Sequence, residues 1–186
     1  MNLLWEQQAD SPHLYVDGPI SGNVLIDAGT CEGNFALRFV DSFQQLYLIE
    51  GDSRWAEVLR KTFSPFGDRV HIIDKFLSRY DTDDSIRLDS LPISSVDFLK
   101  MDIEGAEVDA LLGGKRLLQR SHGHAAICAY HRKNDEENIR FILRKYGYQT
   151  NTSNGYMCFV YDQDGIAELR RGIVYAEKID KVDDSL

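Results

Sequence analysis

The chain has 186 residues, a formal net charge of −9 and 43% hydrophobic residues, a composition typical of one globular domain. The negative charge repels a phosphate backbone, so we expect no nucleic-acid partner. No apolar run approaches the length of about 18 residues that a membrane span requires, so we expect no membrane contact. Three cysteines, Cys31, Cys128 and Cys158, show neither a pairing pattern nor metal-ligand spacing, which indicates a reducing, cytoplasmic location.

The breaker cluster Pro19-Ile-Ser-Gly22 divides the chain into a leader, residues 1–21, and a single domain, residues 22–186. Hydrophobic periodicity then predicts, in chain order, a strand at 23–27, a helix at 34–43, a strand at 45–50, a helix at 53–63, strands at 70–73 and 96–101, a helix at 104–118, a strand at 125–130, a helix at 134–146 and a hairpin of 148–151 with 156–161.

Two details qualify these helices. Gly113-Gly114 weakens the helix predicted over 104–118, because each glycine in a helix interior costs about 1 kcal/mol. Asn134 and Glu137 have capping-box spacing at the start of the last helix. Continuous apolar strands that alternate with helices predict an α/β fold, with a mostly parallel sheet covered by helices on both faces and an antiparallel edge at the final hairpin.

The segment VLIDAGTCEGNF, residues 24–35, follows a buried strand with an acid, Asp27, and two glycines, Gly29 and Gly33. A dinucleotide fold uses the closer spacing Gly-x-Gly-x-x-Gly to hold a pyrophosphate. The wider loop and its acid favour a ligand that carries an ammonium group and no phosphate, such as S-adenosylmethionine. The alternative makes Asp27 a helix cap and the glycines tight-turn residues. We expect the cofactor to contact Asp27, Ala28, Gly29, Thr30, Gly33 and Asn34.

Two further strand ends lie near the expected nucleoside. Glu50 ends the second strand in LIEGD, about 20 residues after the glycine loop, where a carboxylate can accept both ribose hydroxyls; Gly51 follows it. This feature does not distinguish NAD from S-adenosylmethionine. After the third strand come Asp74, Lys75 and Phe76, which are candidates for the adenine edge; a surface turn explains them equally well.

The segment FLKMDIEGAE, residues 98–107, ends a fourth strand in Asp102 on the same ligand-facing rim. Glu104 and Glu107 open a helix, where the macrodipole favours acids, and this accounts for Glu107. Lys100 is unusual in a buried strand and most simply pairs with a neighbouring acid.

At this point the chain resembles the FkbM family of S-adenosylmethionine-dependent methyltransferases. The resemblance rests on VLIDAGTCEGNF, LIEGD, residues 85–91, FLKMDIEGAEVDALLGG, residues 129–131 and residues 171–176. It implies a Rossmann-like class I methyltransferase with a seven-stranded sheet whose last strand is antiparallel, and O-methylation of a hydroxyl on a small molecule, natural product or saccharide. The family loop usually reads Gly-Ala-Asn where this chain has Gly29-Thr-Cys31, and Glu-Pro where it has Glu50-Gly51.

Methyl transfer to a hydroxyl needs a base, and His131 ends the fifth strand on the same rim. Its ordinary pKa of about 6.5 leaves it largely neutral at pH 7. The alternative is a structural histidine that caps the next helix or bonds a carbonyl. Glu104 is the second candidate, as a base or as an anchor for the acceptor hydroxyl. Asp102, Glu104 and His131 are also candidate ligands for Mg²⁺.

Three functions remain open. A methyltransferase acting on a hydroxyl fits best, a non-catalytic S-adenosylmethionine-binding module needs no base, and an NAD-dependent oxidoreductase lacks its glycine spacing. The short leader and the lack of an inserted lid predict an acceptor pocket that is shallow, or completed by the leader or a second subunit. We therefore hypothesise a homodimer that pairs near the hairpin or the leader.

Overall fold

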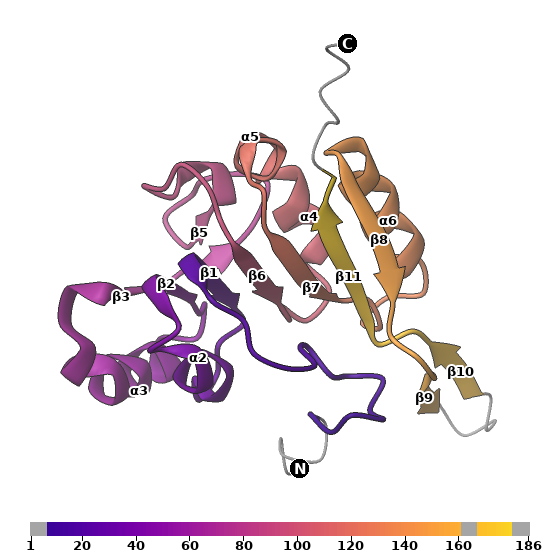
Figure 1. Cartoon of the computed structure of the whole chain (residues 1–186), viewed down its shortest axis with the longest axis horizontal. Coiled ribbons are helices and arrows are strands. Elements are labelled where there is room, and N and C mark those ends of the chain that lie inside the picture. Colours follow the sequence, from indigo (N-terminus) through magenta and orange to yellow (C-terminus); the bar gives the residue numbers. More distant parts are fainter. Residues whose placement is uncertain (1–6, 161–166, 180–186) are drawn as a thin grey trace.

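The computed structural model describes residues 7–160 and 167–179 (Figure 1). Seven strands form one sheet in the order β3-β2-β1-β6-β7-β11-β8. The strands are β1 Gly22–Ala28, β2 Phe43–Ile49, β3 Val70–Ile73, β6 Phe98–Met101, β7 His124–Cys128, β8 Tyr148–Thr152 and β11 Ile173–Lys178. The helices are α2 Asn34–Phe39, α3 Ser53–Phe63, α4 Glu107–Leu112, α5 Lys115–Arg120 and α6 Asp135–Lys145, with 3₁₀ helices η1 Ser64–Arg69 and η2 Leu88–Ser90.

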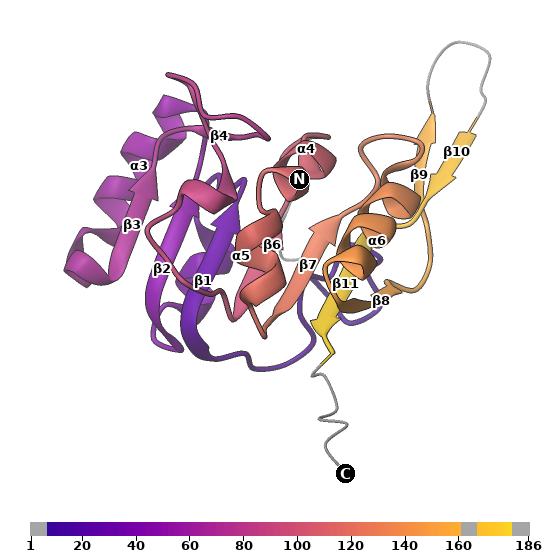
Figure 2. The same cartoon turned by 90° about the horizontal axis from the view of Figure 1, so that it is seen from above.

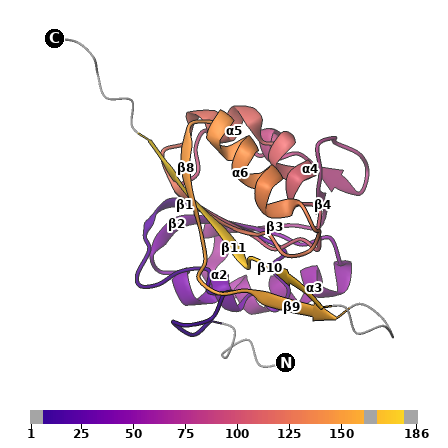
Figure 3. The ribbon, with the colours of Figure 1, turned by 90° about the vertical axis from the view of Figure 1, so that its right-hand side faces the viewer.

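The sheet is parallel except at β11, which runs antiparallel to both β7 and β8. Helices α2 and α3 cover one face and α4, α5 and α6 cover the other (Figure 3). This confirms the predicted α/β fold: a Rossmann-like, mostly parallel seven-stranded sheet with an antiparallel last strand.

Strands in the middle of the sheet are buried on both faces because successive side chains point in opposite directions. In β1, Leu25 joins a core with α2 and α3, whereas Ile26 joins a core with α4, α5 and α6. This double burial explains why β1, β2 and β6 appear in the sequence as continuous apolar runs.

The helix predicted over residues 104–118 is two helices, α4 and α5, that separate at Gly113 and Gly114. A Cβ at Gly113 would lie 2.2 Å from the carbonyl oxygen of Ser78, so the glycine allows a backbone segment to pass closely. The predicted cap is also wrong, because the Asn134 side chain makes no capping hydrogen bond; Asp135 accepts from the Arg132 N–H instead, at 2.8 Å.

A C-terminal antiparallel hairpin is present, but its strands differ from those predicted. Residues 148–152 form β8 and pair with β11, while β9 Met157–Val160 pairs with β10 Ala167–Arg170 in a separate two-stranded sheet. These two strands project beyond the main sheet (Figure 2). A second small sheet joins β4 Phe76–Leu77 to β5 Ser85–Ile86. Tyr161, the last residue of the predicted hairpin, lies outside the described residues.

The described part of the leader lies on the sheet face that α2 and α3 also cover, where Tyr15 and Val16 join their core. The Tyr175 hydroxyl on β11 donates a hydrogen bond to the carbonyl of Leu14. The leader is thus part of the domain's packing and not an appendage. Within residues 7–160 and 167–179, no helix combines the length and apolar character that crossing a bilayer requires.

Candidate active site

The loop after β1 brings the chain close to the end of β6. Gly29 has a left-handed φ of 71°, and a Cβ there would lie 1.6 Å from the carbonyl oxygen of Asp102. Gly33 has φ 82°, and its Cβ would lie 2.7 Å from the Phe63 ring. The Thr30 hydroxyl donates to the carbonyl of Asp27 and closes the turn. Packing therefore requires both glycines, and it places the loop directly beside Asp102.

Asp27 lies beneath this loop with no exposed surface, 3.0 Å from Lys100 Nζ. The Lys100 ammonium also donates to the carbonyls of Gly29, at 2.7 Å, and Ala28, at 3.3 Å. Burial raises the pKa of Asp27, and the Lys100 charge opposes that rise. The predicted ion pair of Lys100 is confirmed. Asp27 and Ala28 lie below the loop and have no exposed surface; α2 begins after Gly33 without a side-chain cap.

Glu50 is held in place by the backbone on both sides. Its Oε2 accepts from the Cys31 N–H and its Oε1 from the Asp52 N–H, each at 2.9 Å. Each carboxylate oxygen can accept a second hydrogen bond, so the group can still receive two ribose hydroxyls. Asn34, also predicted at the cofactor, is the exposed first residue of α2.

Phe76 stands next to this carboxylate. A Cβ at Gly51 would lie 2.1 Å from the Phe76 ring, so the ring rests on the Gly51 backbone, and Phe76 is 60% exposed. Asp74 instead pairs with Arg60 at 3.0 Å, and Lys75 Nζ donates to the carbonyl of Thr82 at 3.0 Å. The adenine-edge interpretation thus fits Phe76, while the surface-turn alternative fits Asp74 and Lys75.

Asp102 is the meeting point of four side chains. It accepts from the Tyr15 hydroxyl at 2.6 Å and from the Tyr130 hydroxyl at 3.4 Å. His131 Nε2 lies 3.4 Å from one of its oxygens and His13 Nε2 3.6 Å from the other. Burial would raise the pKa of Asp102, but His13, the Lys100 charge and the Tyr15 hydroxyl together lower it well below its ordinary range. Asp102 is therefore a carboxylate.

His131 lies between acids at both ring nitrogens. Nδ1 is 3.0 Å from Glu107, while Nε2 faces Asp102 and, at 3.5 Å, Glu104. Burial lowers the pKa of His131, but Glu107, then Asp102 and Glu104, raise it, and the net shift is upward. The pKa of His131 is therefore above the ordinary value that the sequence analysis assumed.

Glu107 is fully buried, and its Oε1 also accepts from the Ile103 N–H at 2.9 Å. Because Glu107 contacts His131, the helix dipole alone does not explain why an acid occupies this position. Among the described residues, Asp102, Glu107 and His131 bring ligand atoms within 4.8 Å of one another. Glu104, which the sequence placed in a Mg²⁺ site, does not belong to this set, and its side chain is 91% exposed.

Sequence reasoning missed four residues of this site: His13, Tyr15, Cys128 and Tyr130. Burial, with Cys128 and Asp102 nearby, raises the pKa of Tyr15 and of Tyr130, so both hydroxyls stay protonated donors. Only Tyr130 had a signal in the sequence, as the neighbour of His131 at the end of a strand.

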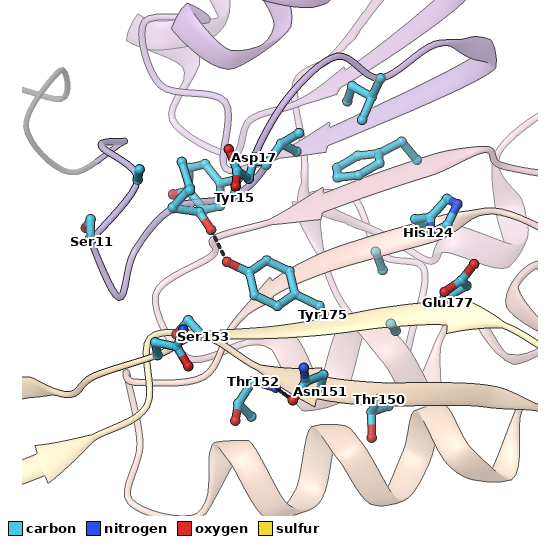
Figure 4. Close-up of a pocket in the computed structure, with 18 of the residues that line it drawn as sticks. Ser11, Tyr15, Asp17, His124, Thr150, Asn151, Thr152, Ser153, Tyr175 and Glu177 are labelled. Atoms are coloured by element: carbon cyan, nitrogen blue, oxygen red, sulfur yellow. Dashed lines mark hydrogen bonds between the residues drawn. The ribbon is translucent and has the colours of Figure 1, made fainter.

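A separate pocket of about 770 Å³ lies on the sheet face beside the leader (Figure 4). Tyr15 and Asp17 of the leader, Tyr175 of β11 and Asn151 of β8 line it, and none of the predicted site residues does. The pocket is thus distinct from the rim that carries Glu50 and Asp102.

The strand order, the glycine loop after β1 and the acids after β2 and β6 define a class I methyltransferase fold. Residues 36–150, more than half of the chain, match the sequence model of the FkbM methyltransferase domain. The chain belongs to this family. Among curated proteins, none matches the chain.

Solved structures agree with this fold. An FkbM methyltransferase from Methylobacillus flagellatus superposes with a TM-score of 0.66 at 20% identity, over 83% of this chain and 43% of that one. A precorrin-6y C5,15-methyltransferase from Geobacter metallireducens has a TM-score of 0.56 at 16% identity, over 84% and 80%. An S-adenosylmethionine-dependent O-methyltransferase from Thermotoga maritima has a TM-score of 0.57 at 13% identity, over 88% and 62%. The present chain spans less than half the length of the FkbM structure.

The contact between Gly29 and Asp102 yields a stability prediction. We expect Gly29→Ala to lower the free energy of unfolding by about 3 kcal/mol in urea titrations, because its Cβ collides with a backbone oxygen. Gly155→Ala is the matched control, since Gly155 has φ 76° and its Cβ would be 3.9 Å from Pro12. It should cost about 1 kcal/mol, the strain of the left-handed backbone alone. Equal losses would contradict the collision.

The Asp27–Lys100 pair yields a second stability prediction. Lys100→Met should destabilise the chain by about 3–5 kcal/mol, because it leaves a buried carboxylate without its cation. Adding Asp27→Asn removes that charge and should recover at least ~1 kcal/mol in the same urea titration. A double variant less stable than Lys100→Met would refute the coupling.

Proposed function

We propose that the chain is an S-adenosylmethionine-dependent methyltransferase that methylates a hydroxyl of a small molecule, natural product or saccharide. The observation that carries the proposal is the continuity of the rim. Glu50 binds the backbone of the glycine loop, the loop touches the backbone of Asp102, and Asp102 faces His131. A nucleoside bound at Glu50 would thus be separated from the candidate base, His131, only by the glycine loop and Asp102.

The residues present fit the nucleoside part of that cofactor. The Glu50 carboxylate keeps acceptor capacity for the ribose, and the Phe76 ring offers an exposed aromatic face next to it. Bound S-adenosylmethionine supplies a methyl group on a positively charged sulfur. Asp27 is engaged with Lys100, so we propose that it supports the loop and does not bind the ammonium group.

His131 fits the part of the base. With Nδ1 toward Glu107, the ring can keep its hydrogen there and leave the Nε2 lone pair on the rim. Nε2 would then be placed to take the proton of an acceptor hydroxyl whose oxygen displaces S-adenosylhomocysteine from the methyl carbon. Glu107 and Asp102 stabilise the imidazolium that results, and exposed Glu104 is placed to anchor the acceptor.

We assign no Mg²⁺ to this step, because Glu104 is outside the set of converging ligand atoms. A non-catalytic binding module would share the donor contacts and lack turnover. The pairing of two chains stays a prediction.

Donor binding gives the first test of the proposal. We expect Glu50→Ala to weaken the binding of S-adenosylmethionine and S-adenosylhomocysteine by about 10–100-fold in calorimetry, the cost of one or two charge-assisted hydrogen bonds. Glu57→Ala is the control, because Glu57 is an acid on the exposed side of α3 paired with Lys61. The absence of any binding heat with the unaltered chain would refute the proposal.

The pH profile gives the second test. His131 works as a base only when neutral, so the rate should rise with pH through its raised pKa. Glu107→Gln removes one charge that raises this pKa, so the acid limb of kcat/KM should move to lower pH. His131→Ala should lower turnover by about 10²–10⁴-fold and abolish the limb, with donor binding retained. An unmoved limb in Glu107→Gln would exclude His131 as the titrating base.

A further inference from the structure

Behind Asp102, a second group of side chains converges on His13 Nε2. The Tyr130 hydroxyl lies 3.1 Å from this nitrogen, the Tyr15 hydroxyl 3.3 Å, Cys128 Sγ 3.6 Å and Asp102 Oδ2 3.6 Å. These residues come from the leader and from the ends of β6 and β7. Three parts of the chain that are distant in sequence therefore meet at one nitrogen.

A single hydrogen bond of His13 Nε2 does not account for all four neighbours. An imidazole Nε2 carries either one hydrogen or one lone pair, so it forms one of these bonds at a time. The Tyr15 proton is already directed at Asp102, at 2.6 Å. Nitrogen, oxygen and sulfur atoms that can each offer a lone pair are thus gathered around the same small volume, an arrangement that a cation can stabilise when His13 Nε2 carries no hydrogen.

Two of the three separations between ligand atoms are close to the edges of a tetrahedral metal site. With bonds of about 2.0–2.1 Å to nitrogen and oxygen and about 2.3 Å to sulfur, tetrahedral angles place a nitrogen about 3.5 Å from a sulfur and about 3.4 Å from an oxygen. The observed distances from His13 Nε2 to Cys128 Sγ and to Asp102 Oδ2 are both 3.6 Å. All three ligand atoms lie within 4.8 Å of one another.

The chemistry of the donors selects the metal. A thiolate, an imidazole and a carboxylate suit Zn²⁺, whereas Mg²⁺ prefers oxygen alone. Cys128 is fully buried and His13 nearly so, while the Asp102 side chain, 19% exposed, leaves one side open. Lys100 pairs with Asp27 and also helps to keep Asp102 ionised, so Asp102 is a carboxylate that can bind a cation.

The other candidate set, Asp102 with Glu107 and His131, is satisfied without a metal. Each nitrogen of His131 faces a carboxylate oxygen at 3.0 or 3.4 Å, which is an ion-pair arrangement of opposite charges. The group at His13 instead brings a thiol and an imidazole to the Asp102 carboxylate, the mixed donor set that Zn²⁺ prefers. We propose that His13 Nε2, Asp102 Oδ2 and Cys128 Sγ bind one Zn²⁺ ion, with the Cys128 proton released to solvent as the thiolate forms. This site shares Asp102 with the proposed methyl-transfer site, but it does not require methyl transfer to take place.

Cobalt serves as the spectroscopic probe of this site. Titration of the metal-free full chain with Co²⁺ should produce a thiolate-to-cobalt charge-transfer band that saturates at one equivalent, and Zn²⁺ should bleach it. Cys128→Ser should abolish the band and weaken Zn²⁺ binding by at least ~100-fold. Cys158→Ser is the matched control, because Cys158 is an exposed free thiol, and it should leave the band unchanged.

A second variant tests whether the loss of the band in Cys128→Ser comes from a folding defect. His13→Gln keeps the thiol and should shift the band and weaken Zn²⁺ binding, while circular dichroism reports the fold of both variants. No band in the unaltered chain, or a band that survives Cys128→Ser, would overturn the site. Neither result bears on donor binding at Glu50, so failure here is distinguishable from failure of the proposed function.

Discussion

One buried charge, the Lys100 ammonium, holds the two halves of the candidate site together. Lys100 and Asp27 are register partners on neighbouring strands, which places a cation and an anion side by side under the glycine loop. The same ammonium binds two loop carbonyls and lies 5.2 Å from the centre of the Tyr15 ring. Because Tyr15 in turn holds Asp102, the loop and the acid of β6 share one support. Exposed ion pairs contribute little to the free energy of unfolding, whereas removing one partner of a buried pair lowers it by several kcal/mol. The Lys100–Asp27 pair therefore holds the rim firmly in place.

Backbone strain gathers at the same rim. Within residues 7–160 and 167–179, the non-glycine residues with positive φ are Cys31, at 47°, and Glu104, at 56°. One lies in the loop after β1 and the other in the loop after β6. Residues with a strained backbone persist where the surrounding structure holds them in place. Here the Cys31 N–H donates a hydrogen bond to Glu50, and the loop packs at Gly29 against the carbonyl of Asp102. An asparagine tolerates this conformation better than a cysteine does.

The sheet and most of the residues at its rim were predictable from sequence. A strand buried on both faces appears as a continuous apolar run, and the end of the run marks the carboxyl end of the strand. Glu50, Asp102 and His131 were placed after the ends of their strands in this way, and the structure has them there. The pairing of β8 was not predictable, because its partner β11 lies beyond two further strands and only three-dimensional packing selects it. Glu107 was misjudged because a buried acid and an exposed helix-dipole acid have the same local sequence. His13 and Tyr15 could not be found, because nothing in an irregular leader indicates what it will contact.

The hydrogen bond from Tyr175 to Leu14 has a consequence for the order of synthesis. It joins segments separated by 161 positions, and β11 must insert between β7 and β8 before its tyrosine can receive the leader. Contacts of such long sequence separation form late, since loop closure costs entropy first. A nascent chain would therefore carry Asp102 without its full set of neighbours until β11 has left the ribosome, so competence for ligands should appear abruptly at that point.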